Sequence, residues 1–424
     1  MLYLPAIAIG RLTRFAVRLL RPGGGSALPG LVLRKIAPGL LKRTLSQFEQ
    51  GLVIITGSAG KSTTTKMAVA IVRAHGLRVF TNPSTANIEQ GFYSAILERS
   101  NLFGKIEGDI AILEMDEAHA ASIVKRIKPR FATILNVLED QLDRFGDPVN
   151  VRNDLAKVAE AATGGVALNA DDQNLLWMLA ESSGVSNVSW FGLAETVLRT
   201  ARKGLGTAPT YLFELDRPDT QTTGIAVNDL EIAVTLNSGD VIRTTLPSRG
   251  LHFAVDAVAA LETAQRLLGD DFDGELAARV LSELPPVFAR GELKEVGGET
   301  VEFILVQNPP SFQLNLDNLT TKPEQIMFAV GTDVHDPSWL WTVDLKNLTH
   351  ADVVTGYNHA EAALLLAYHE IPVGKVLADL EEALEAFFSL PKPSHGVKTV
   401  IFSADSMRRI RRALGFTDPE DVER

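Results

Sequence analysis

The sequence LVIITGSAGKST at residues 52–63 places a short apolar run directly before a glycine-rich loop. A helical pattern of apolar residues follows through Met67 and Ile71. A strand, a glycine loop and a helix in this order are the context of a phosphate-binding loop. Gly57 and Gly60 let backbone N–H groups turn toward phosphate oxygens, and the helix N-terminus adds positive potential. The stretch therefore predicts a nucleotide site on an α/β sheet.

The polar residues of this loop have distinct expected roles. Lys61 would bridge the β- and γ-phosphates, and the Ser62 hydroxyl would coordinate Mg²⁺. The candidate nucleotide contacts of the loop are Gly57, Ser58, Gly60, Lys61, Ser62 and Thr63. Two residues separate the glycines, where the standard NTPase loop has four. The alternative interpretation is a glycine turn that holds no ligand.

An acidic cluster, Glu114-Met115-Asp116-Glu117, follows the apolar run 110–113. Carboxylates at the carboxyl end of a strand, beside a phosphate loop, are placed to hold magnesium or its waters. We expect Glu114 to take this role, with Glu117 as the second candidate. Taken without the loop, the cluster would be a solvated turn.

Short apolar runs alternate with helical segments along most of the chain, which predicts α/β architecture with mostly parallel sheets. The runs are 52–55, 110–113, 131–135, 166–168, 301–306, 326–330 and 399–402. We expect a central domain over 46–290 and a second α/β domain over 291–424. Short alternating strands with turn signals predict a small β insertion at about 196–248. Ligands of such sheets bind at the carboxyl ends of the strands.

The first 45 residues form a basic helical segment. Arg11, Arg14, Arg18 and Arg21 are three or four positions apart and so share one face of a helix. This stripe could lie on an anionic membrane surface, or it could be the solvated face of a helix docked on its own domain.

The composition excludes several classes of function. A net charge of −11 argues against a general nucleic-acid binder, because a phosphate backbone calls for a basic partner. The chain has no cysteine, hence no disulfide, no thiolate nucleophile and no Cys-ligated zinc. This fits a cytoplasmic protein. No apolar run is long enough to suggest a membrane span.

Longer motifs occur in order along the chain, at residues 23–30, 56–65, 81–87, 136–144, 168–172, 288–292 and 336–341. The most specific are GGGSALPG at 23–30, NVLEDQLDR at 136–144 and DPSWLW at 336–341. Together they resemble the Mur ligases, and most closely the ligase subunits of lipid II isoglutaminyl synthases. The resemblance implies a Mur ligase-like central P-loop ATPase domain and a C-terminal Rossmann-like domain that binds a partner.

The resemblance also implies a reaction in cell-wall (peptidoglycan) biosynthesis. ATP and Mg²⁺ would convert the α-carboxylate of D-glutamate in the lipid II stem peptide into an acyl phosphate. Ammonia would then displace phosphate and leave isoglutamine. A carboxylate cannot lose oxide directly, so activation is needed, and Lys61 with Mg²⁺ would screen the charge that gathers during phosphoryl transfer. The enzyme would work in the cytoplasm, at the inner face of the membrane.

Further site residues follow from the resemblance alone. Asn136 and Asp140 match positions near the nucleotide and the metal, and Asn169 and Asp171, with Asp172, match a turn on the nucleotide side. Arg290 lies in the motif at 288–292 and is a further nucleotide candidate. A plain Asn-Ala-Asp-Asp turn is the alternative for residues 169–172.

The lack of cysteine bears on the source of ammonia. Glutamine hydrolysis by a class I amidotransferase needs a Cys nucleophile, so this chain cannot perform it in that way. The resemblance implies a separate GatD-like glutamine amidotransferase, with Asp336 completing the Cys–His site of that partner. The alternative role for Asp336 is a helix N-cap.

The chain also departs from the family pattern at several places. Ala59 stands where Asn is usual, Glu139 where Arg is usual, Phe253 and Asp256 where asparagines are usual, and Gln307 where Lys is usual. The loop before Asp336 is short, and the zinc-ribbon cysteines of many members are missing between 196 and 248, which predicts no zinc. Two alternatives therefore stand: a Mur-like ligase for another carboxylate and amine, and an inactive paralogue that binds nucleotide.

Overall fold

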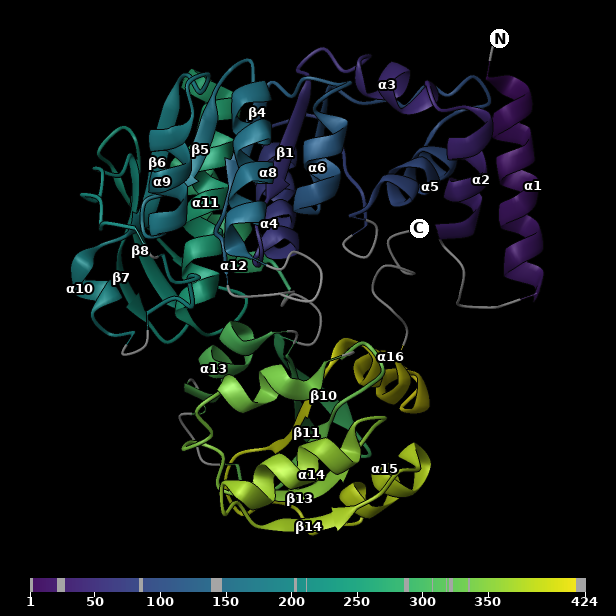
Figure 1. The fold of residues 1–424 in the computed structure, drawn as a ribbon, viewed down its shortest axis with the longest axis vertical. Coiled ribbons are helices and arrows are strands. Elements are labelled where there is room, and N and C mark those ends of the chain that lie inside the picture. Colours follow the sequence, from purple (N-terminus) through teal and green to yellow (C-terminus); the bar gives the residue numbers. More distant parts are fainter. Residues whose placement is uncertain are drawn as a thin grey trace.

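The computed structural model describes residues 3–416 apart from a few segments. The segments left out are 21–26, 84–86, 139–146, 202–203, 211, 286–289, 307, 318, 320–322 and 335. Two sheets, each covered by helices, form a central and a C-terminal domain (Figure 1). The predicted α/β class with mostly parallel sheets is confirmed.

The central sheet has nine strands in the order β2-β3-β1-β4-β5-β6-β7-β8-β9. All pairings from β2 to β7 are parallel, and β8 and β9 add an antiparallel end. The strands within 196–248 thus extend the main sheet. The bounds are β1 Leu52–Thr56, β2 Val79–Phe80, β3 Ile110–Glu114, β4 Phe131–Ile134, β5 Val166–Asn169, β6 Val188–Leu193, β7 Thr222–Asn228, β8 Glu231–Thr235 and β9 Val241–Thr245.

Strand β1 is apolar at every position up to Thr56 because both of its faces are buried. Leu52 and Ile54 join the core under one layer of helices, and Val53 and Ile55 join the core under the other layer. The first layer comprises α5 Glu89–Arg99, α6 Glu117–Ile123, α8 Pro148–Ala161 and α9 Gln173–Glu181. The second comprises α4 Lys61–Ala74, α11 Leu251–Leu268 and α12 Gly274–Glu283. Short elements are α10 Glu195–Leu198 and η1 Gly269–Asp271.

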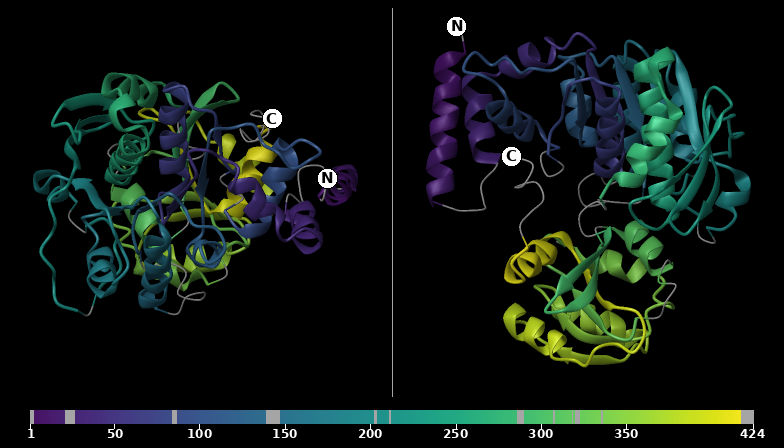
Figure 2. Two further views of the ribbon diagram at one scale, coloured as in Figure 1. Left: turned by 90° about the horizontal axis from the view of Figure 1, so that it is seen from above. Right: turned by 180° about the vertical axis from the view of Figure 1, so that it is seen from behind.

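Three N-terminal helices pack beside α5, at the edge of the central domain (Figures 1 and 2). They are α1 Leu4–Leu20, α2 Ala27–Ile36 and α3 Leu40–Leu45. Glycines permit the close approach: a Cβ at Gly30 would lie 1.9 Å from the carbonyl oxygen of Gln90. Two arginines of the expected stripe face inward. Arg11 donates to the carbonyl of Ser100, and Arg14 forms an ion pair with Glu98 at 2.5 Å.

The C-terminal sheet has the strand order β10-β11-β15-β12-β13-β14, and only the β10–β11 pairing is antiparallel. The strands are β10 Arg290–Val296, β11 Glu299–Leu305, β12 Ile326–Ala329, β13 Ala351–Thr355, β14 Val373–Val376 and β15 Lys398–Phe402. The helices are α13 Pro309–Asp317, η2 Pro337–Thr342, α14 His359–Tyr368, α15 Leu380–Phe388 and α16 Ala404–Ala413. Separate apolar clusters fill its two faces. No helix among the described residues is long and apolar enough to cross a membrane.

Candidate active site

The glycine loop connects the end of β1 to the start of α4. Gly57 and Gly60 adopt φ values of +132° and +85°, which side-chain-bearing residues rarely take. Gly60 is the N-cap of α4, and no side chain caps this end of the helix. The 14-residue helix thus begins at a residue without a side chain, as is usual where a helix N-terminus binds phosphate.

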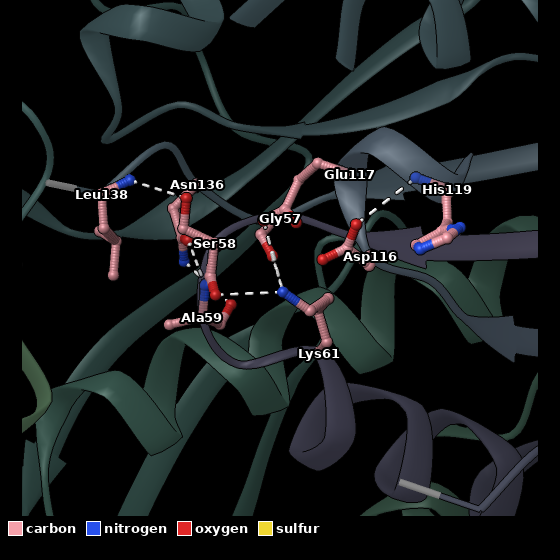
Figure 3. A network of polar contacts seen from close by, with 9 residues as sticks. All are labelled: Gly57, Ser58, Ala59, Lys61, Asp116, Glu117, His119, Asn136 and Leu138. Atoms are coloured by element: carbon pink, nitrogen blue, oxygen red, sulfur yellow. Dashed lines mark hydrogen bonds and ion pairs between the residues drawn. The ribbon is translucent and has the colours of Figure 1, made fainter. Parts of the chain in front are cut away.

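Asn136, which follows β4, holds the loop in shape. Its amide accepts from Ala59 N at 2.9 Å and donates to Ala59 O at 3.2 Å, while Ser58 N donates to Asn136 O. Leu138 N donates to Ser58 Oγ at 3.0 Å (Figure 3). These contacts use only the backbone of residue 59, so the departure from Asn to Ala leaves them intact. Asn136 is a positioning residue for the loop.

The side chain of Lys61, the residue that follows the loop, turns back onto the backbone of the loop. Its Nζ donates to the carbonyls of Gly57 and Ser58, and lies 3.4 Å from Glu117 Oε1 (Figure 3). The two side chains are only 12% and 4% exposed. Burial raises the pKa of Glu117, and the nearby Lys61 cation opposes the shift. Glu117 thus holds the ammonium of Lys61 at the mouth of the loop.

The other carboxylates of the cluster lie at and just after the carboxyl end of β3, the strand next to β1. Glu114 ends β3, is buried, and pairs in register with Ile55, one residue before the loop-bearing end of β1. Asn82 exchanges two 3.1 Å hydrogen bonds with the backbone of Glu114. Asp116 is the N-cap of α6 and accepts from His119 N. Asn82 lies in the motif at 81–87, but no local sequence pattern indicates that it would hold Glu114, 32 residues away.

Residues 169–172 join three loops at the carboxyl end of the sheet. Asn169 donates to Leu135 O at 2.9 Å. Asp171 accepts from Leu193 N and from Arg217, both at 2.8 Å, and burial raises its pKa. Asp172 accepts from Val137 N and caps α9. These side chains hydrogen-bond to the neighbouring backbone, and Asp171 also to Arg217, so they fix the loops at this end of the sheet. A direct nucleotide contact by Asn169 or Asp171 stays a prediction.

Asp172 gives a pH dependence that can be tested. Burial raises its pKa to about 6, although hydrogen bonds from Val137 and Asn174 oppose the shift. The native chain therefore holds this proton more tightly than the unfolded chain does. The contribution of Asp172 to the free energy of unfolding falls by about 3 kcal/mol as pH rises from about 4 to about 6, and is constant outside that window.

We expect Asp172→Asn to remove this pH-dependent part of the free energy of unfolding. Urea unfolding of both proteins at about pH 4 and about pH 7 should show a wild-type advantage that shrinks at the higher pH. A difference that stays the same at both pH values would contradict the prediction.

Two departures from the family pattern lie on α11. Phe253 is fully buried in the core between α11 and the sheet. An apolar core contact therefore stands where the family usually has a polar asparagine. Asp256 is buried against the loop: Thr64 Oγ1 donates to Asp256 Oδ1 at 3.3 Å, and a Cβ at Gly60 would lie 2.1 Å from the same oxygen. Position 60 therefore requires glycine for two reasons: its positive φ, and the Asp256 carboxylate in the space that a Cβ would occupy.

Gly60→Ala should reduce nucleotide affinity by at least about tenfold, because the new methyl group must displace Asp256 and disturb the helix N-terminus. Gly76→Ala is the matched control at the other end of α4. Its φ is +90°, but a Cβ there meets nothing within 4 Å. Titration with an ATP analogue should show loss of affinity in the first variant only. Equal loss in both would mean that backbone strain, and not the site, is responsible.

Asp336 lies in the C-terminal domain, where it is the N-cap of η2. Its side chain accepts from Ser338 N at 2.9 Å and is exposed. Hydrogen bonds from Ser338 lower the pKa of Asp336, so the carboxylate is ionised at neutral pH. Nearby, Trp341, Tyr368 and His369 form an aromatic group in which Trp341 and Tyr368 are exposed. Asp336 is thus both the N-cap of η2 and an exposed negative charge.

Three of the residues singled out in the sequence cannot be placed in the site. Asp140, Glu139 and Gln307 lie outside the described residues. Arg290 begins β10 and pairs with Ile304 through its backbone.

Known proteins resemble the chain in both domains. A model of the Mur ligase middle domain matches residues 55–261, and a model of the MurT ligase C-terminal region matches residues 305–403. Among solved structures, MurF from Acinetobacter baumannii has a TM-score of 0.66 at 18% identity, covering 91% of this chain and 81% of that one. MurF ligase from Thermotoga maritima, in complex with ADP, has a TM-score of 0.64 at 19% identity, covering 90% and 83%. These likenesses show the fold.

The chain belongs to the Mur ligase family, the class of ATP-dependent ligases that its fold and glycine loop define. Within that family it is similar to lipid II isoglutaminyl synthase (glutamine-hydrolyzing) subunit MurT of Streptococcus pneumoniae. The two are 26% identical over 418 residues, which cover 89% of each chain.

Proposed function

We propose that the chain is the ligase subunit of a two-protein enzyme that amidates the α-carboxylate of D-glutamate in lipid II. The observation that carries the proposal is the combination, in one chain, of a glycine loop at the N-terminus of a helix and a C-terminal domain matched by the MurT model. A nucleotide loop alone would fit any Mur-type ligase. The C-terminal match favours the amidating type.

The site residues support a two-step reaction. A carboxylate oxygen attacks the γ-phosphorus of ATP and ADP leaves; ammonia then attacks the acyl carbon and phosphate leaves. Lys61, already at the mouth of the loop, is placed to neutralise the transferring phosphoryl group. Ser62, in the first turn of α4, and Glu114, at the end of β3, would hold Mg²⁺, which supplies charge neutralisation to the phosphates.

The contact between Glu117 and Lys61 supports this role of the lysine. Glu117 keeps Lys61 within the loop before the nucleotide binds, because its carboxylate lies 3.4 Å from the lysine Nζ and both side chains are largely buried. Arrival of the phosphates would transfer the ammonium from Glu117 to the nucleotide.

The ammonia would come from a GatD-like glutaminase. The chain has no cysteine with which to hydrolyse glutamine. Asp336 offers an ionised carboxylate on the surface of the C-terminal domain, at the start of the short helix η2 that carries the exposed Trp341, whose ring contacts Tyr368. Aromatic residues are enriched at the centres of protein interfaces, so this group is suited to dock the partner and present Asp336 to its active site.

The test is to incubate the purified chain with ATP, Mg²⁺, lipid II and an ammonium salt, and to follow phosphate and the product by mass spectrometry. We expect one isoglutamine for each phosphate released. Phosphate release without isoglutamine would instead indicate a Mur-like ligase for another carboxylate and amine. Nucleotide binding without any turnover would indicate an inactive paralogue.

A further inference from the structure

The N-terminal helix α1 presents an apolar face to solvent. Among residues 3–17, every exposed side chain is apolar. We call these residues the outer face of α1: Leu4, Pro5, Ile9, Leu12, Phe15 and Ala16. Leu12 and Phe15 are each 68% exposed, and α1 lies at the edge of the molecule (Figure 1).

This orientation is the reverse of that in an ordinary surface helix, which turns its charges outward. Here the inner side of α1 uses Ile7 for the core and Gly10 for close contact with Leu97. The guanidinium group of Arg14 reaches Glu98 on α5. That of Arg11 reaches the carbonyl of Ser100, the residue after α5. Arg11 and Arg14 therefore fix the helix in place, and the exposed side chains among residues 3–17 are all apolar. Such a patch marks an interaction surface.

The charge of this region indicates what covers the outer face. The first 48 residues contain eight basic and no acidic residues, in a chain whose net charge is −11. Three of these cations are exposed: Lys35 on α2, and Lys42 and Arg43 on α3. Arg43 also stacks over Tyr3 at the start of α1, with 5.4 Å between the guanidinium carbon and the ring centroid. An apolar face with exposed cations on the neighbouring helices is complementary to an anionic bilayer surface.

We propose that the outer face of α1 lies in the interfacial layer of an anionic membrane and holds the protein there peripherally. The 17-residue helix packs on α2 and α5, so it lies on the bilayer and does not cross it. The inference rests on the proposed function in one respect: it would bring the ligase to a lipid-linked substrate. The membrane contact itself needs no nucleotide.

The experiment is co-flotation of the full chain with phosphatidylcholine vesicles that contain or lack phosphatidylglycerol. We expect binding to the anionic vesicles, weakened by salt, and much weaker binding to the neutral ones. The double variant Leu12→Ser with Phe15→Ser should bind at least about tenfold more weakly, because two large apolar side chains no longer enter the lipid. Both positions are exposed, so the core is unchanged.

The matched control replaces Leu212 and Phe213 by Ser. This exposed apolar pair lies in the connection between α10 and β7, on the other side of the central domain (Figure 1). It should bind vesicles like the wild type. Equal binding by the wild type and the α1 variant, or no binding by the wild type, would overturn the proposal.

Two other outcomes would assign the outer face to a protein. If the wild type is a dimer and the α1 variant a monomer, the face joins two copies and the proposal fails. It also fails if the variant loses a glutaminase partner while its vesicle binding is unchanged. Phosphate release with a soluble muropeptide separates this test from the proposed function, because the α1 variant should retain that activity.

Discussion

Replacing Lys61 with alanine should reduce ATP-dependent phosphate release by at least about 10²- to 10³-fold, the usual cost of removing one group that stabilises charge in a transition state. Lys61 is the cation that the loop holds against its own carbonyls, 3.4 Å from Glu117. Without it, the phosphoryl group would transfer with its charge unscreened. Phosphate release in the presence of lipid II and ammonium measures the effect.

The control for this variant is Lys66→Ala, five residues further along α4. Lys66 reaches the carbonyl of Pro285 at 3.4 Å, so its loss should leave turnover within about twofold of the wild type. Circular dichroism should establish that both variants are folded, since Lys61→Ala leaves Glu117 buried beside no cation. Turnover that survives in Lys61→Ala would contradict the assignment of the loop.

Asp336→Asn should reduce glutamine-dependent amidation by at least about 10²-fold and leave ammonium-dependent amidation unchanged. Asparagine is as good an N-cap as aspartate, so η2 should keep its first hydrogen bond from Ser338 N. What disappears is the negative charge, which would orient and stabilise a protonated imidazole in the partner. The two activities are measured on the complex with its glutaminase.

The C-terminal domain offers a matched control in Asp379→Asn. Asp379 is also an exposed N-cap, and its side chain accepts from Glu382 N at 3.0 Å at the start of α15. This substitution should change neither activity. If Asp336→Asn reduced both activities together, Asp336 would support the fold or the ligase site and would not complete the partner.

Much of the architecture could be predicted from the sequence because its signals are local. The buried strands are apolar runs, and the glycine loop follows β1 directly, so strand, loop and helix could be placed together. The N-cap alternative for Asp336 could be named for the same reason, since aspartate before Pro337 is a local pattern.

The parts that escaped prediction depend on contacts between distant residues. Nothing near Arg14 indicates that Glu98 will pair with it, so the stripe suggested an outward face where the structure turns Arg11 and Arg14 inward. The strands after residue 221 extend the main sheet because β7 pairs with β6 across some thirty residues. Asp256 lies 192 residues from Thr64 in the sequence, so its position behind the loop could not be foreseen.

Strand β1 lies inside the central sheet, with β3 on one side and β4 on the other, and both of its faces are buried. The glycine loop is a direct continuation of this strand, so it keeps its shape only while the whole sheet is intact. A ligand bound there should delay melting of the entire central domain, adding about 2.7 kcal/mol at a hundredfold excess over its dissociation constant. Heating the protein with graded amounts of nucleotide would therefore measure affinity without lipid or partner.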